Sequence, residues 1–585
     1  MAAIISEKFR IFNAKQFLES LGEGVNDADT DRTRMYFFVG RSSRWDAYLE
    51  IFNVNGTFQV GETVTAGGWS GVVAEVYSNS LLLNTILPTP STTPAFGSSL
   101  GGSTSGAIAK TGTYRYGTEE APPAPLDNSA ERKSIFDEMI AAKRITSSFA
   151  RLVVPRYNWN LSLNPKFDMY RPDYSVTPGG GGAIGKQTAL GASSLSASKF
   201  YVMNSRYEVF KCLYNGEYDS NSGANATYEP TSQPIAGQGT FANGVFTEPT
   251  GTAGYIWKHM FTLPTGDVLA FLSSDFMPIG ASGEATRVAV EALAVNGSID
   301  TAVVKDKGSN LPLTSTLYTS VYGDGNGAIV KLETDGSGSV TSCSVEAEGS
   351  GYSYGNVILE TGKVFTDAAL TAAAGAFSGT ASIEAIISPL GGHGSDAENE
   401  LFAKRVMTSI RLTYDEGSGD FPVDNDFRRI GIIQDPFVYG SSTFASDSTL
   451  RGTRVVKVNG ATASYVADET ISQTVGSEVS YGTVVSWDAT NGILKYFQSP
   501  SVHTDNGVVR PFVSNGTDAI VGASSTASGT VSNTENGIVS DIQFTGGLAS
   551  PEIEPNSGEV VYIENRRQIT RAPDQIEDIK LVIEF

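Results

Sequence analysis

The chain has 585 residues, of which 63 are glycine, and its formal net charge is −22 with only 18% charged residues. This length exceeds what one hydrophobic core supports and predicts about three or more domains, while the composition predicts short strands joined by many turns. The negative charge disfavours nucleic acid as a partner. No leader pattern and no run of about 18 apolar residues occurs, so we expect a soluble protein made in a cytoplasm.

The first half of the chain begins with a predicted short helix, capped by Asn13 and Gln16 before Phe17 and ending at Gly22. Residues 35–39 are predicted to form a strand. Residues 49–118 change to a glycine- and threonine-rich β pattern. A second helix is expected to begin at Asn128, with one apolar face made of Ile135, Phe136, Met139 and Ile140. Further strands are expected at 200–202, 207–214 and 255–263.

In the second half, 285–387 is repetitive and β-like, without the character of a catalytic fold. The chain ends with an apolar strand at 560–563, a polar break at Asn565 and Arg566, and a strand at 581–585. A chain end is normally frayed unless something pairs with it. We therefore expect the last strand to be built into a sheet.

Two stretches, 58–83 and 465–497, repeat one order of features: an aromatic residue, Glu-Thr and an apolar residue, a glycine followed by Val-Val, then a turn and an apolar strand. Each is followed by a Ser-Gly pair, at Ser105 and at Ser528. This repetition predicts two copies of one small β module. Glu62 and Glu469 are expected in equivalent strands, with Trp69 offset from Trp487.

Two glycine-rich motifs resemble ligand-binding loops. Residues 180–186 read G-x-x-x-x-G-K, but Gln187 stands where a phosphate-binding loop needs Ser or Thr, so a flexible loop is favoured. Residues 323–328, GDGNGA, offer Asp324 and Asn326 without the closing Glu of a calcium loop, so a turn is favoured.

The other candidate side chains also favour structural roles. The histidines are scattered, and His259 is best interpreted as a packed, hydrogen-bonded strand residue. The acidic pairs are Asp415/Glu416 and Glu577/Asp578. The two side chains of each pair are neighbours in sequence and point in different directions, so we interpret them as solvent-exposed surface residues rather than as a glycosidase dyad. Arg566 and Arg567 beside Glu564 suggest an ion pair in a turn. Cys212 and Cys343 lie in different modules, so no disulfide is expected. We expect no catalytic, cofactor-binding or metal-binding residues; the interface residues stay unknown.

Several segments together resemble one family, the baseplate wedge subunits of T4-type contractile-tailed phages (the gene product eight family). The C-terminal pattern is G-E-x-x-Y-x-E-N-R at 558–566, followed by DQIEDI at 574–579 and a final Phe. Ordered matches elsewhere are EKFR (7–10), FFVGRSSRW (37–45), VVPRYNW (153–159), YEVFKCL (207–213), GYIWKHMF (254–261) and FRRIGIIQDP (427–436).

The resemblance implies a structural, non-enzymatic subunit of the virion tail baseplate, assembled in the host cytoplasm. Its implied partners are other wedge proteins and a second copy of itself, with no nucleic acid, membrane, small-molecule substrate or cofactor. The alternative is a tail-associated carbohydrate-binding or glycan-cleaving adhesin. The only tryptophans that suggest it are Trp69 and Trp487, one in each copy of the repeated module.

The matches also suggest how the chain divides. We expect a mainly β fold with a few short helices, in which three unmatched stretches are sandwich- or barrel-like modules inserted into loops of one core. The core parts are 1–48, 119–284, 391–460 and 536–585, and the inserts are 49–118, 285–390 and 461–535.

Overall fold

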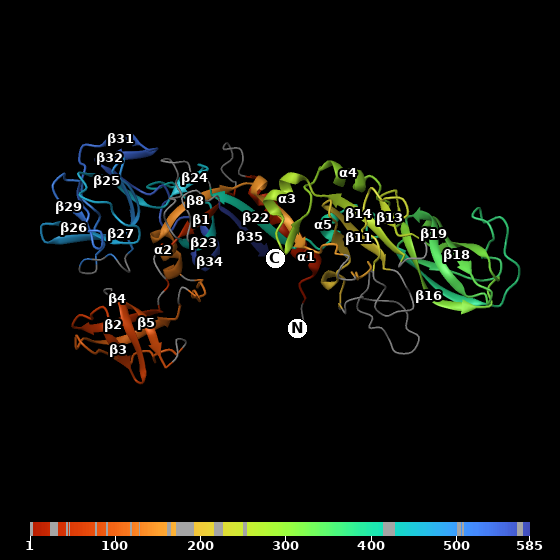
Figure 1. The fold of residues 1–585 in the computed structure, drawn as a ribbon, viewed down its shortest axis with the longest axis horizontal. Coiled ribbons are helices and arrows are strands. Elements are labelled where there is room, and N and C mark those ends of the chain that lie inside the picture. Colours follow the sequence, from red (N-terminus) through yellow and green to blue (C-terminus); the bar gives the residue numbers. More distant parts are fainter. Residues whose placement is uncertain are drawn as a thin grey trace. The chain divides into compact units, whose positions relative to one another are not determined.

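The computed structural model describes residues 4–23, 33–42, 45, 47–76, 79–88, 92–117, 120–127, 129–160, 165–170, 192, 194–215, 226–249, 254–412, 427–499, 503, 505, 508–569 and 577–585. The fold is mainly β, with 46% strand and 10% helix arranged in several sheets and barrels (Figure 1). The predicted fold class, a mainly β multi-domain protein with a few short helices, is therefore confirmed.

The chain forms two compact units, each assembled from segments that are distant in sequence. Unit 1 contains Met1–Glu19, Ala150–Ser409 and Lys580–Phe585, and unit 2 contains Ser20–Phe149 and Ile410–Ile579. The division of the chain into one core with three inserts stays a prediction, and the sheets are described below unit by unit.

Unit 1 contains two antiparallel sheets that carry several of the family-like segments. Their orders are β15-β9-β22-β35 and β10-β11-β14-β13-β12. Buried aromatic side chains, among them Phe210, Phe246 and Trp257, make the core of the second sheet. The strands are β9 (Ala150–Pro155), β10 (Tyr201–Met203), β11 (Glu208–Asn215), β12 (Thr240–Ala242), β13 (Val245–Thr247), β14 (Tyr255–Thr262), β15 (Phe276–Pro278), β22 (Arg405–Leu412) and β35 (Glu577–Glu584). The helices of unit 1 are α3 (Thr265–Phe271), α4 (Ala285–Glu291) and α5 (Ala397–Glu400), with a short 3-10 turn η3 (Leu195–Ala197). Helix α1 (Glu7–Glu23) begins in unit 1 and ends in unit 2, and the 3-10 turn η1 (Ser147–Phe149) belongs to unit 2.

Residues 299–387 of unit 1 bury a core of their own. Leu317, Val330 and Leu332 are fully buried at its centre. A long pair of strands, β16 (Ile299–Ser309) and β21 (Thr380–Ile387), leads into and out of this region. Between them lies the sheet β19-β18-β17-β20, made of β17 (Thr316–Gly323), β18 (Asn326–Thr334), β19 (Val340–Ser350) and β20 (Gly355–Val357).

The central sheet of unit 2 has the order β24-β8-β1-β23-β34. Strand β23 pairs with β1 on one side and with β34 on the other, so three family-like segments become neighbours. Helix α2 (Ser129–Asp137) precedes β8. The strands are β1 (Met35–Gly40), β8 (Met139–Ile145), β23 (Phe427–Gln434), β24 (Thr449–Arg451) and β34 (Glu559–Ile569).

Unit 2 also contains a closed six-stranded barrel, here called barrel one. Its order around the ring is β2-β5-β4-β3-β6-β7. Alternate side chains such as Leu49, Ile51 and Val64 fill its interior, as the period of a strand requires. The strands are β2 (Ala47–Asn55), β3 (Thr63–Ala66), β4 (Trp69–Val76), β5 (Ser80–Leu87), β6 (Ser99–Gly102) and β7 (Ile108–Arg115).

A second ring, barrel two, repeats this topology. Its order is β25-β28-β27-β26-β29-β30, and the pairing of β30 with β25 closes it. The strands are β25 (Arg454–Asn459), β26 (Thr470–Val475), β27 (Glu478–Asp488), β28 (Ile493–Phe497), β29 (Ala519–Gly522) and β30 (Ser528–Val531). The sheet continues from β25 into β33 (Leu548–Ala549), β32 (Ile542–Thr545) and β31 (Asn536–Val539). Strand β25, which precedes residue 461, thus belongs to the barrel because Val456 and Val458 pack in its core.

The two barrels also match in register. Phe52 stands opposite Lys110 in barrel one, and Asn459 stands opposite Thr530 in barrel two. The two stretches thus share one topology, with Trp69 opening β4 and Trp487 near the end of β27. The two Ser-Gly pairs are not equivalent in the structure, because the register places Ile108 rather than Ser105 at the position of Ser528.

Some predicted element boundaries are wrong. Helix α1 begins at Glu7 rather than near Asn13. Helix α2 ends at Asp137, and Met139 and Ile140 lie in β8, where Met139 stands opposite Gly40 of β1. The expected polar break at Asn565 and Arg566 does not end the strand, since β34 runs through both and Asn565 stands opposite Arg429 of β23. The ladder shifts in register directly after Asn565, before Ile569 stands opposite Phe427.

The final strand is part of a sheet, as predicted. Strand β35 lies at the edge of β15-β9-β22-β35, with Ile579 and Leu581 buried. Phe585 follows it, and its ring lies 5.4 Å from that of Phe17.

We predict that Leu581→Ala destabilises unit 1 by about 2 to 5 kcal/mol, because a buried leucine leaves a cavity. Urea unfolding followed by tryptophan fluorescence measures this change. Val561→Ala is the matched control, because the Val561 side chain is 48% exposed. Equal midpoints for the two variants would contradict a packed final strand.

Candidate functional site

Of the two glycine-rich motifs, the one at 323–328 lies in the described part of the chain. The carboxylate of Asp324 accepts hydrogen bonds from the backbone N–H groups of Ser353 at 2.9 Å and Tyr354 at 3.1 Å. Asn326 pairs with Ser350 in the ladder between β18 and β19. Asp324 therefore closes a turn, as its motif predicts. Residues 180–186 lie outside the described part of the chain.

Each of the three histidines packs against neighbours of its own. In β14, Nε2 of His259 lies 3.1 Å from Thr262 Oγ1, and the ring lies 5.1 Å from that of Phe210. His503 Nδ1 accepts a hydrogen bond from the N–H of Ser499 at 2.9 Å, and burial lowers the pKa of His503 to about 4. Both histidines are packed, and His259 is the packed strand residue that the sequence predicts.

The acidic and basic residues near the C-terminus form surface ion pairs. Glu564 and Arg566 lie 3.3 Å apart, within β34 rather than in the predicted turn. Asp578 is 2.7 Å from Arg411 on the neighbouring strand. Asp415 and Glu416, and the side chain of Glu577, lie outside the described residues.

A buried charge network in unit 2 joins three family-like segments, and sequence analysis did not identify it. Arg429 of β23 donates to Glu131 Oε1 of α2 at 2.5 Å and to Asn565 Oδ1 of β34 at 3.0 Å. Arg41, after β1, lies 2.8 Å from Glu138. Burial lowers the pKa of Arg429, and the carboxylates of Glu138 and Glu131 oppose this. The network holds a helix and three strands in one geometry.

A second buried cluster lies in unit 1. Lys211 of β11 is fully buried and forms an ion pair with Glu400 of α5. Burial raises the pKa of Glu400, but Lys211 and His393 outweigh it and hold the pKa at about 2. Burial also lowers the pKa of His393, whose ring lies edge-on to Tyr170 at 4.8 Å. The cluster tethers α5 to β11, and neither of the two grooves described below is lined by Lys211 or Glu400.

Each barrel contains a buried glutamate that clamps a loop. Glu62 Oε2 accepts from the N–H groups of Thr104 at 3.0 Å and Ser105 at 2.9 Å. In barrel two, Glu469 Oε2 accepts from Ser524 and Ser525 at 3.0 and 2.9 Å. The glutamates are therefore equivalent, although each lies one residue before its strand rather than in it.

A glycine stands beside each clamp because the carboxylate leaves no room for a side chain. A Cβ on Gly102 would lie 2.7 Å from Glu62 Oε2, and one on Gly522 would lie 2.6 Å from Glu469 Oε1. Burial raises the pKa of Glu62, but the hydrogen bonds from Ser105 and Gln59 outweigh it and hold the pKa at about 2. The repeated Glu and Gly are the sequence signal of the clamp.

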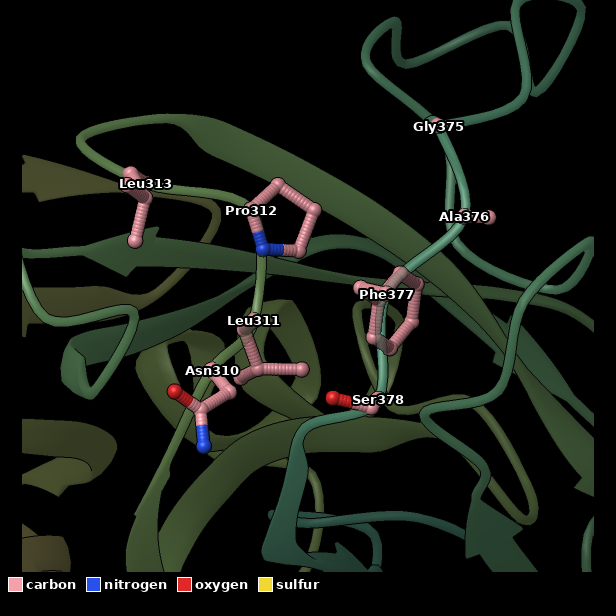
Figure 2. Close-up of a pocket in the computed structure, with 8 residues that line it drawn as sticks. All are labelled: Asn310, Leu311, Pro312, Leu313, Gly375, Ala376, Phe377 and Ser378. Carbon is pink, nitrogen blue, oxygen red and sulfur yellow. The ribbon is translucent and has the colours of Figure 1, made fainter.

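An open groove of about 590 Å³ lies between two loops of unit 1. Figure 2 shows Pro312 and Leu313 on one loop and Ala376 and Phe377 on the other. No charged or titratable side chain lines it, so it offers contact surface rather than acid–base chemistry. The lining residues are Asn310, Leu311, Pro312, Leu313, Gly375, Ala376, Phe377 and Ser378.

We predict that Glu62→Gln and Glu469→Gln each destabilise the protein by about 1 to 3 kcal/mol, because buried donors lose a charged acceptor. The Glu62 clamp has a lowered folded-state pKa, so its stabilisation is present above pH 4.5 and is lost as the pH falls toward 2. Hydrogen exchange at the amides of Ser105 and Ser525 measures each clamp. Glu478→Gln, at a 59% exposed side chain, is the control and should leave both amides protected.

We also predict that Lys211→Met costs about 3 to 5 kcal/mol, because it leaves the carboxylate of Glu400 buried without its cation. Adding Glu400→Leu should restore part of the loss, as measured by thermal unfolding. The control is Lys305→Met, whose half-buried ion pair with Glu384 contributes at most about 1 kcal/mol. A double variant less stable than Lys211→Met would contradict the pairing.

In the described part of the chain, no group of three or more His, Cys, Asp and Glu side chains is placed to hold a metal ion. None of the helices described is both long and apolar enough to cross a membrane. Comparison of the whole sequence with protein-family models finds no matching family. A search of curated proteins likewise finds no match.

Proposed function

We propose that this chain is a structural subunit of the baseplate wedge of a contractile phage tail, acting through protein–protein interfaces and performing no chemistry. Its partners would be other wedge proteins and a second copy of the chain, in the virion. The resemblance of the ordered motifs supports this proposal. Three of these motifs, remote in sequence, are adjacent strands β1, β23 and β34.

The observation that carries the proposal is an apolar patch on the outside of barrel one. The patch consists of Phe52, Val54, Phe96 and Ile108, which are 38%, 42%, 76% and 53% exposed. The rings of Phe52 and Phe96 lie 5.7 Å apart. Exposed apolar side chains gathered in one place mark interaction sites.

Barrel two shows that the fold does not require this patch. The register of β2 and β7 places Asn459 at the position of Phe52 and Ser528 at the position of Ile108. The N–H of Gly97 donates to the carbonyl of Thr111 in β7, and the N–H of Gly516 donates to the carbonyl of Val531 in β30. These two glycines are therefore equivalent, and the residue before each, Phe96 in barrel one and Asn515 in barrel two, occupies the same position. Since the same barrel folds with polar residues at three of these four positions, we infer that the apolar residues of barrel one serve contact with another protein.

The alternative function is a glycan-binding or glycan-cleaving adhesin. Of the two tryptophans that suggest it, only Trp487 is placed to meet a ligand. Trp69 is buried, and its indole N–H donates to the carbonyl of Thr92 at 2.9 Å. Trp487 lines an open groove. A role for Trp487 is argued separately below.

We predict that Phe52→Asn combined with Ile108→Ser, the residues of barrel two, weakens co-assembly with the other wedge proteins of the same phage. Thermal stability should be unchanged, because both side chains are exposed. Co-expression followed by size-exclusion chromatography and sedimentation measures assembly and the expected dimer.

Leu269→Ser is the control, because Leu269 is 73% exposed in α3, outside the patch. It should assemble like the unaltered chain. A chain that stays monomeric and joins no wedge complex would overturn the proposal.

A further inference from the structure

A second groove opens at one end of barrel two, where β25 and β27 finish. Its volume is about 400 Å³, within the range of pockets that hold small ligands, and barrel mouths are a common place for them. The groove lies between the loop after β25 and the turn that joins β27 to β28. Its polar and aromatic lining residues are Lys457, Asn459, Ser464, Trp487, Thr490 and Asn491.

Trp487 supplies a fixed aromatic wall. Its ring packs edge-on against Tyr465 at 5.0 Å, and the hydroxyl of Tyr465 donates to the carbonyl of Ile520 at 2.8 Å. The indole N–H of Trp487 is buried and has no acceptor among the residues that the structure describes. The side chain is half-buried, so what it presents to the groove is aromatic carbon.

The turn that follows Trp487 is polar and held in place by hydrogen bonds. Asp488 Oδ1 accepts from the N–H groups of Thr490 at 2.9 Å and Asn491 at 3.0 Å. The ammonium group of Lys457 donates to the carbonyl of Asn491. Burial raises the pKa of Asp488, but the hydrogen bonds from Asn491 outweigh it and lower the pKa. Asp488 is thus an anion near the Lys457 cation, and the two charges balance.

Barrel one lacks this arrangement. The pairing of β4 with β5 and of β27 with β28 places Val76 at the position of Trp487. The pairing of β2 with β5 and of β25 with β28 places Glu50 at the position of Lys457. The pairing of β2 with β7 and of β25 with β30 places Phe52 at the position of Asn459. The groove residues are therefore additions to a barrel that folds without them.

We propose that the groove of barrel two binds a neutral pyranose unit of a glycan. A pyranose ring has a face of C–H groups that packs on aromatic carbon, and hydroxyls that bond to amide and hydroxyl side chains. Trp487 provides the first surface, and Asn459, Ser464 and Thr490 provide exposed polar groups for the second. The balanced charges of Lys457 and Asp488 favour a neutral sugar over an acidic one. This inference does not depend on the proposed wedge function.

The test is titration of the full-length chain with glucose, galactose, mannose and N-acetylglucosamine. Saturation-transfer NMR and tryptophan fluorescence follow binding. We expect at least one of these sugars to bind with a Kd on the order of 1 mM, and Trp487→Ala to weaken binding about tenfold or more.

Asn459→Phe tests the site without altering the core. It installs the residue of barrel one at an exposed position, and it should block sugar binding while leaving the melting temperature unchanged. Val521→Ala, at a 43% exposed position of β29 outside the groove, should bind as the unaltered chain does. Absence of binding for all four sugars at about 50 mM, or binding that survives both groove variants, would overturn the proposal. Wedge assembly, measured on the same variants, is expected to be unaffected.

Discussion

The organisation of unit 2 depends on β23, which pairs with β1 along one edge and with β34 along the other. These strands come from three distant parts of the chain, so their pairing closes long loops. The closure entropy of a loop grows slowly with its length, by about 0.6 kcal/mol per doubling, so whole barrels can occupy such loops. Position 431 of β23 has room only for glycine, because a Cβ there would lie 2.3 Å from the carbonyl oxygen of Tyr562 in β34.

Buried charges fix the geometry of both units. Arg429 in unit 2 and Lys211 in unit 1 are buried beside carboxylates, and each joins a helix to a strand. Burying an ion pair contributes little net stability, but an unpaired buried charge is strongly unfavourable. Alternative packings that separate these partners are therefore penalised, which favours one arrangement of helix and strand.

The two barrels separate what the fold requires from what has been added to it. Both retain the glutamate clamp and the glycine beside it, because the clamp satisfies loop amides that the barrel would otherwise leave unpaired. Their outer surfaces differ: barrel one carries an apolar patch around Phe52, and barrel two carries a polar groove around Trp487. One scaffold thus carries two different surfaces, and we propose that the first contacts protein and the second a polar ligand.

By itself the sequence determined the β-rich class, the strand at the C-terminus and the existence of two related modules. Those features rest on alternation of apolar residues and on repeated local order, which are properties of neighbouring residues. It failed at α2, where Met139 and Ile140 fit a helical face but lie in β8, because pairing with β1 overrides the local pattern. It also failed at Asn565, whose polar side chain suggested a break although it bonds Arg429 within a continuous strand.

Only the tertiary structure decided which residues meet. Glu131, Arg429 and Asn565 come from three segments, and no spacing in the sequence links them. The groove at Trp487 likewise needs the ends of β25 and β27 to lie at the same mouth of barrel two, which follows from ring closure. Sequence patterns report which face of an element is apolar. The partner across that face depends on contacts between segments far apart in the chain.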